Sequence, residues 1–189
     1  VQFVPEYGLL RGIGYSIFHS VSAFCNAGID ILGSDSLAKY ICNPLINITT
    51  MLLIILSGIG FSVWYDVLGN IKKIRKKEIP GKWWFTRLRL HSKLAIVTTL
   101  ILLAVGTLLT FLLEYHNPDT IGHLNFGEKW MASAFQSVTT RTAGYSTFSQ
   151  AGMHEETRFL NILLMFIGGS PGGTAGGVKT TTIAMLMLT

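Results

Sequence analysis

The chain alternates long uncharged apolar stretches with short polar ones. Residues 45–65 and 94–113 contain no charged residue. At about 1.5 Å of rise per residue, a helix of about 20 residues crosses the roughly 30 Å hydrocarbon core of a bilayer. Pro44 suits the first turn of the first helix, and Glu114 closes the second. The pattern therefore predicts two membrane-spanning helices, each continuous.

Two other apolar stretches, residues 13–23 and 128–140, are shorter. An apolar segment of roughly 10–14 residues is too short to span a bilayer as a helix. Each stretch is followed by polar or glycine-containing sequence rather than by more apolar residues. We expect both to form short helices that are re-entrant or buried.

The last segment, residues 159–189, begins like a spanning helix and is then interrupted. Residues 168–177 contain six Gly and one Pro, and the apolar pattern resumes at Thr180. Such a composition does not hold a regular helix. Broken backbone at membrane depth survives only where it is buried in protein or lines a water-filled path. The break is therefore a candidate functional site.

Two short segments, 18–28 and 135–144, echo each other and align with a single gap. Both carry Ser or Thr, and both end in Ala-Gly followed by a bulky residue, Ile29 or Tyr145. The repeat predicts an all-α integral membrane fold of helix–pore loop–helix units with re-entrant pore helices. We expect residues 1–70 to end one unit, 71–93 to form a basic loop, and 94–189 to form the next unit with the broken helix.

Composition and charge support a membrane protein. Charged residues make up 13% of the chain, about half the share in an ordinary soluble domain. Nine of the 15 Lys and Arg lie in residues 72–93. Each would cost about 2.5–3.5 kcal/mol at the bilayer centre, and the positive-inside rule places such a loop in the cytoplasm. We therefore expect plasma-membrane localisation, contact with lipid, both Ala-Gly turns facing outward, and no nucleic-acid binding.

Other residue types narrow the chemistry. Cys25 and Cys42 give no disulfide framework, and the five His show no metal-ligand spacing. No signal peptide is visible at Val1, and an end inside an apolar stretch indicates a fragment of a longer protein.

The Ala-Gly turns offer the chemistry of a cation path. Backbone carbonyls replace the hydration shell of an ion without a full charge, and glycine tolerates the required backbone angles. Each short helix also points its partly negative C-terminus toward its turn. Thr139, Thr140 and Thr142 would add hydroxyl oxygens. The alternative is an ordinary turn after a buried helix.

Two charged residues lie beside the turns. Arg141 would repel cations if it faced a pore, so we expect it to tie its turn to a carboxylate or to carbonyls. Asp30 follows the first turn, where it either attracts cations or is an ordinary solvated residue.

The glycine-rich break also suggests a nucleotide-binding loop, but the match is poor. Gly172 to Gly177 fit the first part of G-x-x-x-x-G-K-[ST], yet Val178 stands where Lys is required and Lys179 is one place late. We expect Lys179 to reach a cytoplasmic vestibule or to pair with a carboxylate. We predict neither an enzyme nor a bound cofactor.

A secondary transporter for another ion or small solute is a further alternative. Such proteins use broken helices in paired repeats. Here we expect only the second copy to have a break.

Residues 18–30, 135–147 and 168–182 together resemble the Trk/Ktr/HKT superfamily of potassium uptake proteins. The run Gly-Gly-Ser-Pro-Gly-Gly-Thr-Ala-Gly-Gly-Val-Lys-Thr-Thr-Thr is similar to that of bacterial Ktr and Trk membrane subunits. The resemblance implies four such repeats around one pore, of which this chain holds the end of the second and most of the third. It implies a potassium selectivity filter that includes Asn26, Ala27, Gly28, Thr142, Ala143, Gly144 and Tyr145.

The same resemblance implies a gate and partners. The gating loop would comprise Gly168, Gly169, Ser170, Pro171, Gly172, Gly173, Thr174, Ala175, Gly176, Gly177 and Lys179. Family members are homodimers, and in bacteria they pair with a cytoplasmic ring of nucleotide-binding regulatory subunits. Because the first and fourth filters lie outside this sequence, we expect that the chain as written does not conduct by itself.

Overall fold

A computed structural model describes residues 2–33, 36–78 and 80–188 of the chain. Its regular secondary structure is helical, which confirms the predicted all-α class. Two short 3₁₀ helices, Ala38–Tyr40 and Gly81–Trp83, lie in the connections. The α-helices are α1 (Val4–Tyr7), α2 (Leu9–Phe24), α3 (Pro44–Gly58), α4 (Phe61–Arg75), α5 (Leu90–Glu114), α6 (Phe126–Thr139), α7 (Glu155–Phe166) and α8 (Thr180–Leu188).

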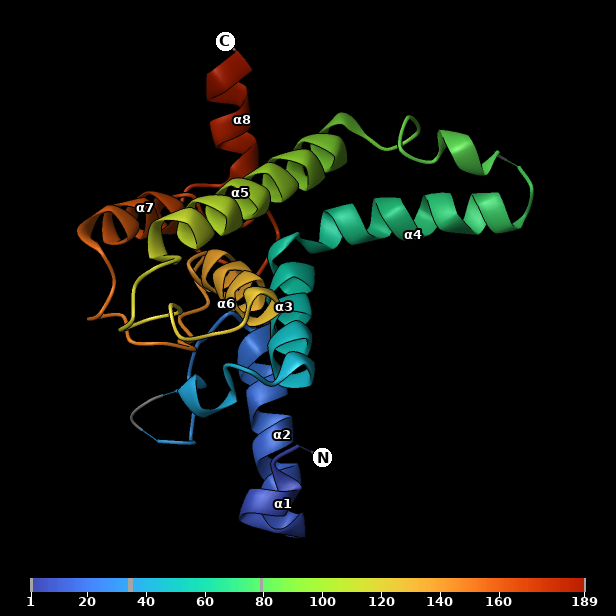
Figure 1. Ribbon diagram of the computed structural model, residues 1–189. Helices are drawn as coiled ribbons and strands as arrows, with labels where there is room; N and C mark the ends of the chain where they lie inside the picture. The colour runs from blue at the N-terminus through green and yellow to red at the C-terminus, as the bar shows by residue number, and fades with distance from the viewer. Residues whose placement is uncertain (1, 34–35, 79, 189) are drawn as a thin grey trace.

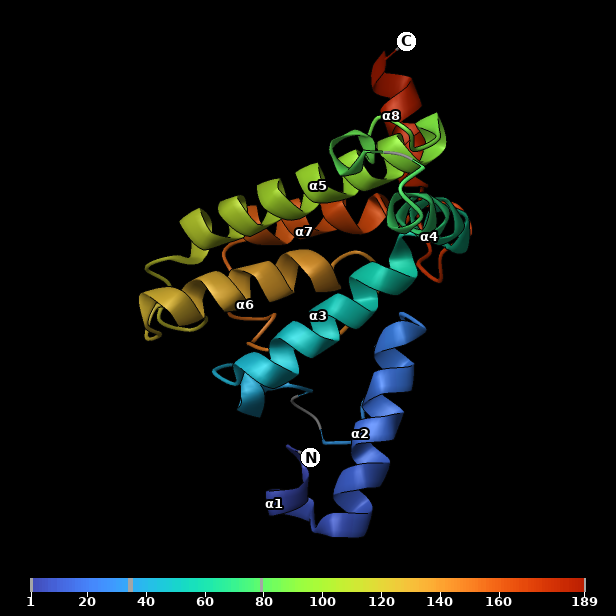
Figure 2. The same cartoon turned by 90° about the vertical axis from the view of Figure 1, so that its right-hand side faces the viewer.

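Helix α6 lies between α5 and α3 (Figures 1 and 2). It packs against α5 on one side and α3 on the other, while α2 packs against α3, and α7 and α8 against α5. Every residue from Phe135 to Thr139, the last turn of α6, is buried. Helices α2 and α6, the two predicted short helices, therefore end near each other inside the fold, and the turns that follow them are brought together.

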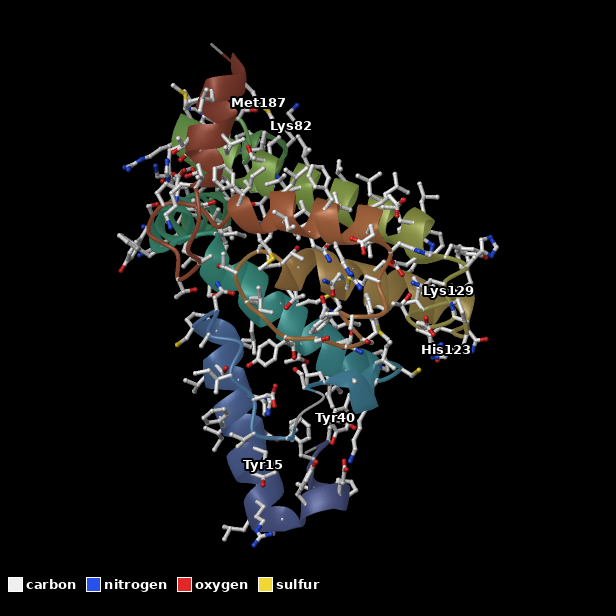
Figure 3. The ribbon with its side chains drawn as sticks, turned by 90° about the vertical axis from the view of Figure 1, so that its left-hand side faces the viewer. Tyr15, Tyr40, Lys82, His123, Lys129 and Met187 are labelled. Atoms are coloured by element: carbon white, nitrogen blue, oxygen red, sulfur yellow. The ribbon has the colours of Figure 1, made fainter. Side chains whose placement is uncertain are left out.

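Helix α5 confirms one of the two predicted continuous helices. It has 25 residues and starts at Leu90, a few residues earlier than expected. Among the helices of the described residues, it alone is long and apolar enough by itself to cross a membrane. In Figure 3, Lys82, before α5, lies near the top of the molecule, and His123, after α5, lies well below it on the right-hand side. The basic segment and the polar α5–α6 connection are thus separated by the length of α5.

The prediction of one continuous helix over residues 45–65 is wrong. Helix α3 ends at Gly58, α4 begins at Phe61, and the two axes meet at 97°. Gly60, between them, has a φ of +95°, a conformation that glycine adopts freely. Both copies of the repeat therefore lead into a broken helix.

The basic segment is also more helical than expected. Helix α4 runs into it as far as Arg75, and α5 begins at Leu90, so only residues 76–89 connect them. The predicted boundaries at residues 71 and 93 therefore fall inside helices.

The ends of α6 were predicted more accurately than those of α2. Helix α6 lies within two residues of the expected ends, and Asn125 and Glu128 form a capping box at its start. Helix α2 begins at Leu9, earlier than residue 13, and has 16 residues. The predicted interruption of the last helix is confirmed, since α7 ends at Phe166 and α8 starts at Thr180.

Candidate functional site

The two Ala-Gly turns share one backbone conformation. Asn26 and Thr142, at equivalent positions, have φ values of +51° and +69°. Gly28 and Gly144 have φ values of +62° and +95°. Positive φ is uncommon for residues other than glycine, so this agreement is specific. The repeat seen in the sequence is thus also a repeat of backbone geometry.

Equivalent hydrogen bonds hold both turns. The Ser22 hydroxyl donates to the Ile29 carbonyl at 2.7 Å, and the Thr139 hydroxyl donates to the Tyr145 carbonyl at 2.7 Å. Thr139 was expected to offer its hydroxyl oxygen to an ion, but the hydroxyl closes the turn instead. Ser22 was missed, although its alignment with Thr139 was a signal in the sequence.

The turns are in direct contact. A Cβ added to Gly28 would lie 2.0 Å from the Ala143 oxygen and 3.0 Å from the Gly144 Cα. Only glycine fits this approach, because a real Cβ contact is essentially never shorter than 3.0 Å. The Tyr145 hydroxyl donates to the Ile29 carbonyl at 3.3 Å, which joins the two copies a second time.

The glycine-rich loop, residues 168–177, is closed at its base by backbone hydrogen bonds. Gly168 N donates to Val178 O, and Val178 N donates to Phe166 O, both at 3.0 Å. A Cβ at Gly168 would lie 1.7 Å from the Gly176 oxygen, so the base requires glycine. The loop is therefore an ordered structure held by its own backbone hydrogen bonds.

Both turns contact this loop through their equivalent residues. The Asn26 side-chain amide donates to the Thr174 hydroxyl at 2.9 Å. Gly176 N donates to the Thr142 hydroxyl at 3.0 Å. The Thr174 hydroxyl also donates to the Phe24 carbonyl at 3.2 Å. The loop thus lies against the same side of both turns.

Arg141 links the second turn to the loop. Its side chain is buried, and Nη2 donates to the Gly168 carbonyl at 3.1 Å and to the Thr99 hydroxyl at 3.4 Å. The predicted tie to carbonyls is confirmed. The guanidinium joins the second turn, helix α5 and the start of the loop.

Of the two roles predicted for Lys179, pairing with a carboxylate is not seen among the described residues, and reaching a cytoplasmic vestibule stays a prediction. Its Nζ donates to the Ala175 carbonyl at 2.8 Å, so it braces the loop itself. Neither ion pair between described residues, Lys39–Glu6 or Arg158–Glu155, involves it. A P-loop lysine must reach a phosphate, and here the ammonium is already bonded inside the loop.

Other candidate chemistry is absent from the part of the chain that the structure describes. It contains no group of three or more His, Cys, Asp or Glu side chains that could hold a metal ion. Cys25 and Cys42 are free and exposed. Asp30 is half-buried beside the first turn, and its role stays a prediction.

A family model described as TrkH, cation transport protein, matches residues 2–189. The chain belongs to the TrkH family. This confirms the resemblance carried by the turns and the glycine-rich loop, and it agrees with the prediction of a transport protein rather than an enzyme.

TrkH relatives with curated descriptions match almost the whole chain. It is 41% identical to the Ktr system potassium uptake protein B of Bacillus subtilis, over 99% of this chain and 39% of that protein. It is 42% identical to the potassium/sodium uptake protein NtpJ of Enterococcus hirae, over 100% of this chain and 39% of that protein. The chain thus spans about two fifths of these relatives' length.

A solved structure shows the same fold. The potassium transporter TrkH from Vibrio parahaemolyticus superposes with a TM-score of 0.71 at 21% identity, over 92% of this chain and 34% of that chain. At this identity the likeness supports the arrangement of the helices and turns.

Proposed function

We propose that this TrkH-family chain is part of the pore-forming subunit of a potassium uptake channel or transporter. The observation that carries the proposal is the direct contact of two turns with matching positive φ at residues 26, 28, 142 and 144. Equivalent strained turns around one point are what a symmetric ring of carbonyl ligands requires. Residues 26–28 and 142–145 are the proposed filter segments.

The free carbonyls of the turns support this assignment. Among the hydrogen bonds between described residues, none ends on a carbonyl oxygen of residues 26–28 or 142–144. By contrast, the next carbonyls, of Ile29 and Tyr145, accept bonds from Ser22 and Thr139. Carbonyl oxygens without internal donors can replace the water around a potassium ion.

The glycine-rich loop is the proposed gate. It contacts both turns, through Thr174 and Gly176, and its start is bonded to Arg141. An ion that leaves the turns on this side meets the loop. Flux then requires the loop to move aside, which we propose is biased by a cytoplasmic nucleotide-binding regulatory ring.

The remaining placement belongs to the same proposal. The subunit lies in the plasma membrane as a homodimer, with the turns outward and residues 76–89 in the cytoplasm. The positive-inside rule supports this orientation, because the basic segment and the α5–α6 connection lie at opposite ends of α5 (Figure 3). The filter needs the repeats outside this chain to close.

A second candidate gains support from the bend between α3 and α4. Secondary transporters use broken helices in paired repeats, and both copies here lead into one. Coupled transport predicts that uptake stops when the gradient of a second ion is removed. A channel predicts that uptake follows the potassium gradient and the membrane potential alone.

The filter assignment is tested by Gly144→Ser in the full-length protein, expressed in cells that lack other potassium uptake. A side chain at φ +95° distorts the turn, so the ratio of potassium to sodium uptake should fall. Gly127→Ser is the matched control, because its Cβ would meet nothing within 4 Å. An unchanged ratio in a well-expressed Gly144→Ser protein would remove the filter assignment.

A further inference from the structure

At the corner between α3 and α4, the last carbonyls of α3 and the first amide of α4 are hydrogen-bonded to the glycine-rich loop. The last carbonyls of a helix have no intrahelical partner. Here Ser170 N donates to Gly58 O at 2.8 Å, and Thr174 N donates to Ser57 O at 3.3 Å. The loop thus supplies the amides that cap the end of α3.

The corner returns a hydrogen bond to the loop. Phe61 N, the first amide of α4, donates to the Gly172 carbonyl at 3.1 Å. The packing is also close, since a Cβ at Gly60 would lie 2.4 Å from the Pro171 oxygen. Three backbone hydrogen bonds in two directions therefore connect the corner and the loop.

The same groups have an alternative pairing. In a continuous α-helix, each N–H bonds to the carbonyl four residues earlier, so Phe61 N would pair with Ser57 O. Ser62 N would likewise pair with Gly58 O. The loop occupies these carbonyls and so replaces the bonds of an unbroken helix. The Ser57 and Gly58 carbonyls and the Phe61 amide consequently have two alternative sets of partners, one with the loop in place and one without it.

Trp64 braces the bent form. Its indole N–H donates to the Leu56 carbonyl at 2.7 Å, which joins the first turn of α4 to the last turn of α3. This bond spans the 97° bend. Helix α4 then continues to Arg75 and carries the start of the basic segment.

We propose that the α3–α4 corner is the catch that holds the glycine-rich loop in place, with Gly60 and Trp64 as its positioning residues. The inference rests on the proposed function of the loop as a gate. When α4 turns toward the axis of α3, the Phe61 and Ser62 amides bond to the Ser57 and Gly58 carbonyls. The loop then loses these partners and is released. A force on the basic end of α4 is thereby transmitted to the ion path.

Two variants of the full-length protein test the catch. Gly60→Ala penalises the φ of +95° that the bent corner needs, and Trp64→Phe removes the indole donor while it keeps an aromatic ring. Rubidium uptake into proteoliposomes without the regulatory partner should rise on the order of fivefold, as the loss of one ordinary hydrogen bond gives. Gly69→Ala, in α4 with open space around it, is the matched control and should not change uptake.

A second measurement does not depend on conduction. Ala175, in the loop, is 4% exposed, so a cysteine introduced there should be protected from a thiol reagent. With Cys25 and Cys42 replaced by Ser, modification of Ala175→Cys should be faster in the Trp64→Phe background than in the Gly69→Ala background. Equal modification rates and equal uptake would overturn the catch. Faster modification with unchanged uptake would instead overturn the loop's role as a gate. If Gly60→Ala does not fold, Trp64→Phe alone tests the catch.

Discussion

At the scale of single residues, equivalent positions in the two turns make equivalent hydrogen bonds. Ser22 and Thr139 close the turns, and Asn26 and Thr142 contact the glycine-rich loop. The sequence predicted that the segments were copies, because local similarity is visible in one dimension. It did not predict that the Thr139 hydroxyl donates to the Tyr145 carbonyl, because that depends on which backbone carbonyl lies nearest after folding.

Arg141 yields a prediction at this scale. Arg141→Gln replaces the guanidinium with a shorter, neutral amide, which cannot reach both Gly168 and Thr99. Buried acceptors left without a donor cost about 1–3 kcal/mol. The full-length variant in detergent should therefore unfold at a temperature several degrees lower, measured by a thermal unfolding assay.

Arg158→Gln is the control for that measurement. Arg158 is partly exposed and paired with Glu155 at 3.0 Å. A surface ion pair contributes about 0–1 kcal/mol, so this variant should unfold close to the wild-type temperature. Equal shifts for the two variants would show that Arg141 does not anchor the loop.

At the scale of elements, the break in the last helix was predictable and the bend between α3 and α4 was not. Six glycines and a proline in residues 168–177 exclude a helix by local propensity. Gly58 and Gly60 cost only about 1 kcal/mol each in a helix interior, so the apolar run around them favours continuity. The bend depends on three hydrogen bonds from a loop more than a hundred residues away, which local sequence does not encode.

Helix α1 supplies a prediction on pH. The Tyr40 hydroxyl and the Lys39 ammonium bond to the Glu6 carboxylate and lower its pKa from the ordinary value of 4.5. A carboxyl whose pKa is lower in the folded state stabilises that state above the unfolded pKa, and the contribution is lost as pH falls through the folded value. Glu6→Gln should therefore speed proteolysis near residue 8 at neutral pH.

The difference between Glu6→Gln and wild type should shrink as the pH falls from about 4.5 through the lowered folded-state pKa, where the carboxylate of the folded wild type becomes protonated. Limited proteolysis of the full-length protein across this range, with an acid-active protease at the low end, measures it. A difference that is the same at every pH would show that the carboxylate charge does not hold α1 in place.

At the scale of the whole molecule, the chain covers part of the length of its relatives. It spans about two fifths of its curated TrkH-family relatives, and under the proposed function it supplies two of the turns of the filter. The apolar faces of α2, α5 and α7 are exposed, including Leu10, Leu100 and Phe166. The family and the repeat could be predicted from the sequence, because the motifs are local. The contact between residues 28 and 143 could not, because it follows from how α2, α3 and α6 pack.

The central claim is that the turns at residues 26–28 and 142–145 form one potassium path. The most direct measurement is a structure of the full-length protein in rubidium, with the ion located by its anomalous scattering. We predict a rubidium peak between the two turns, in contact with carbonyl oxygens of both and absent in Gly144→Ser. A protein that takes up rubidium, but binds it elsewhere and leaves these carbonyls without an ion, would contradict the account.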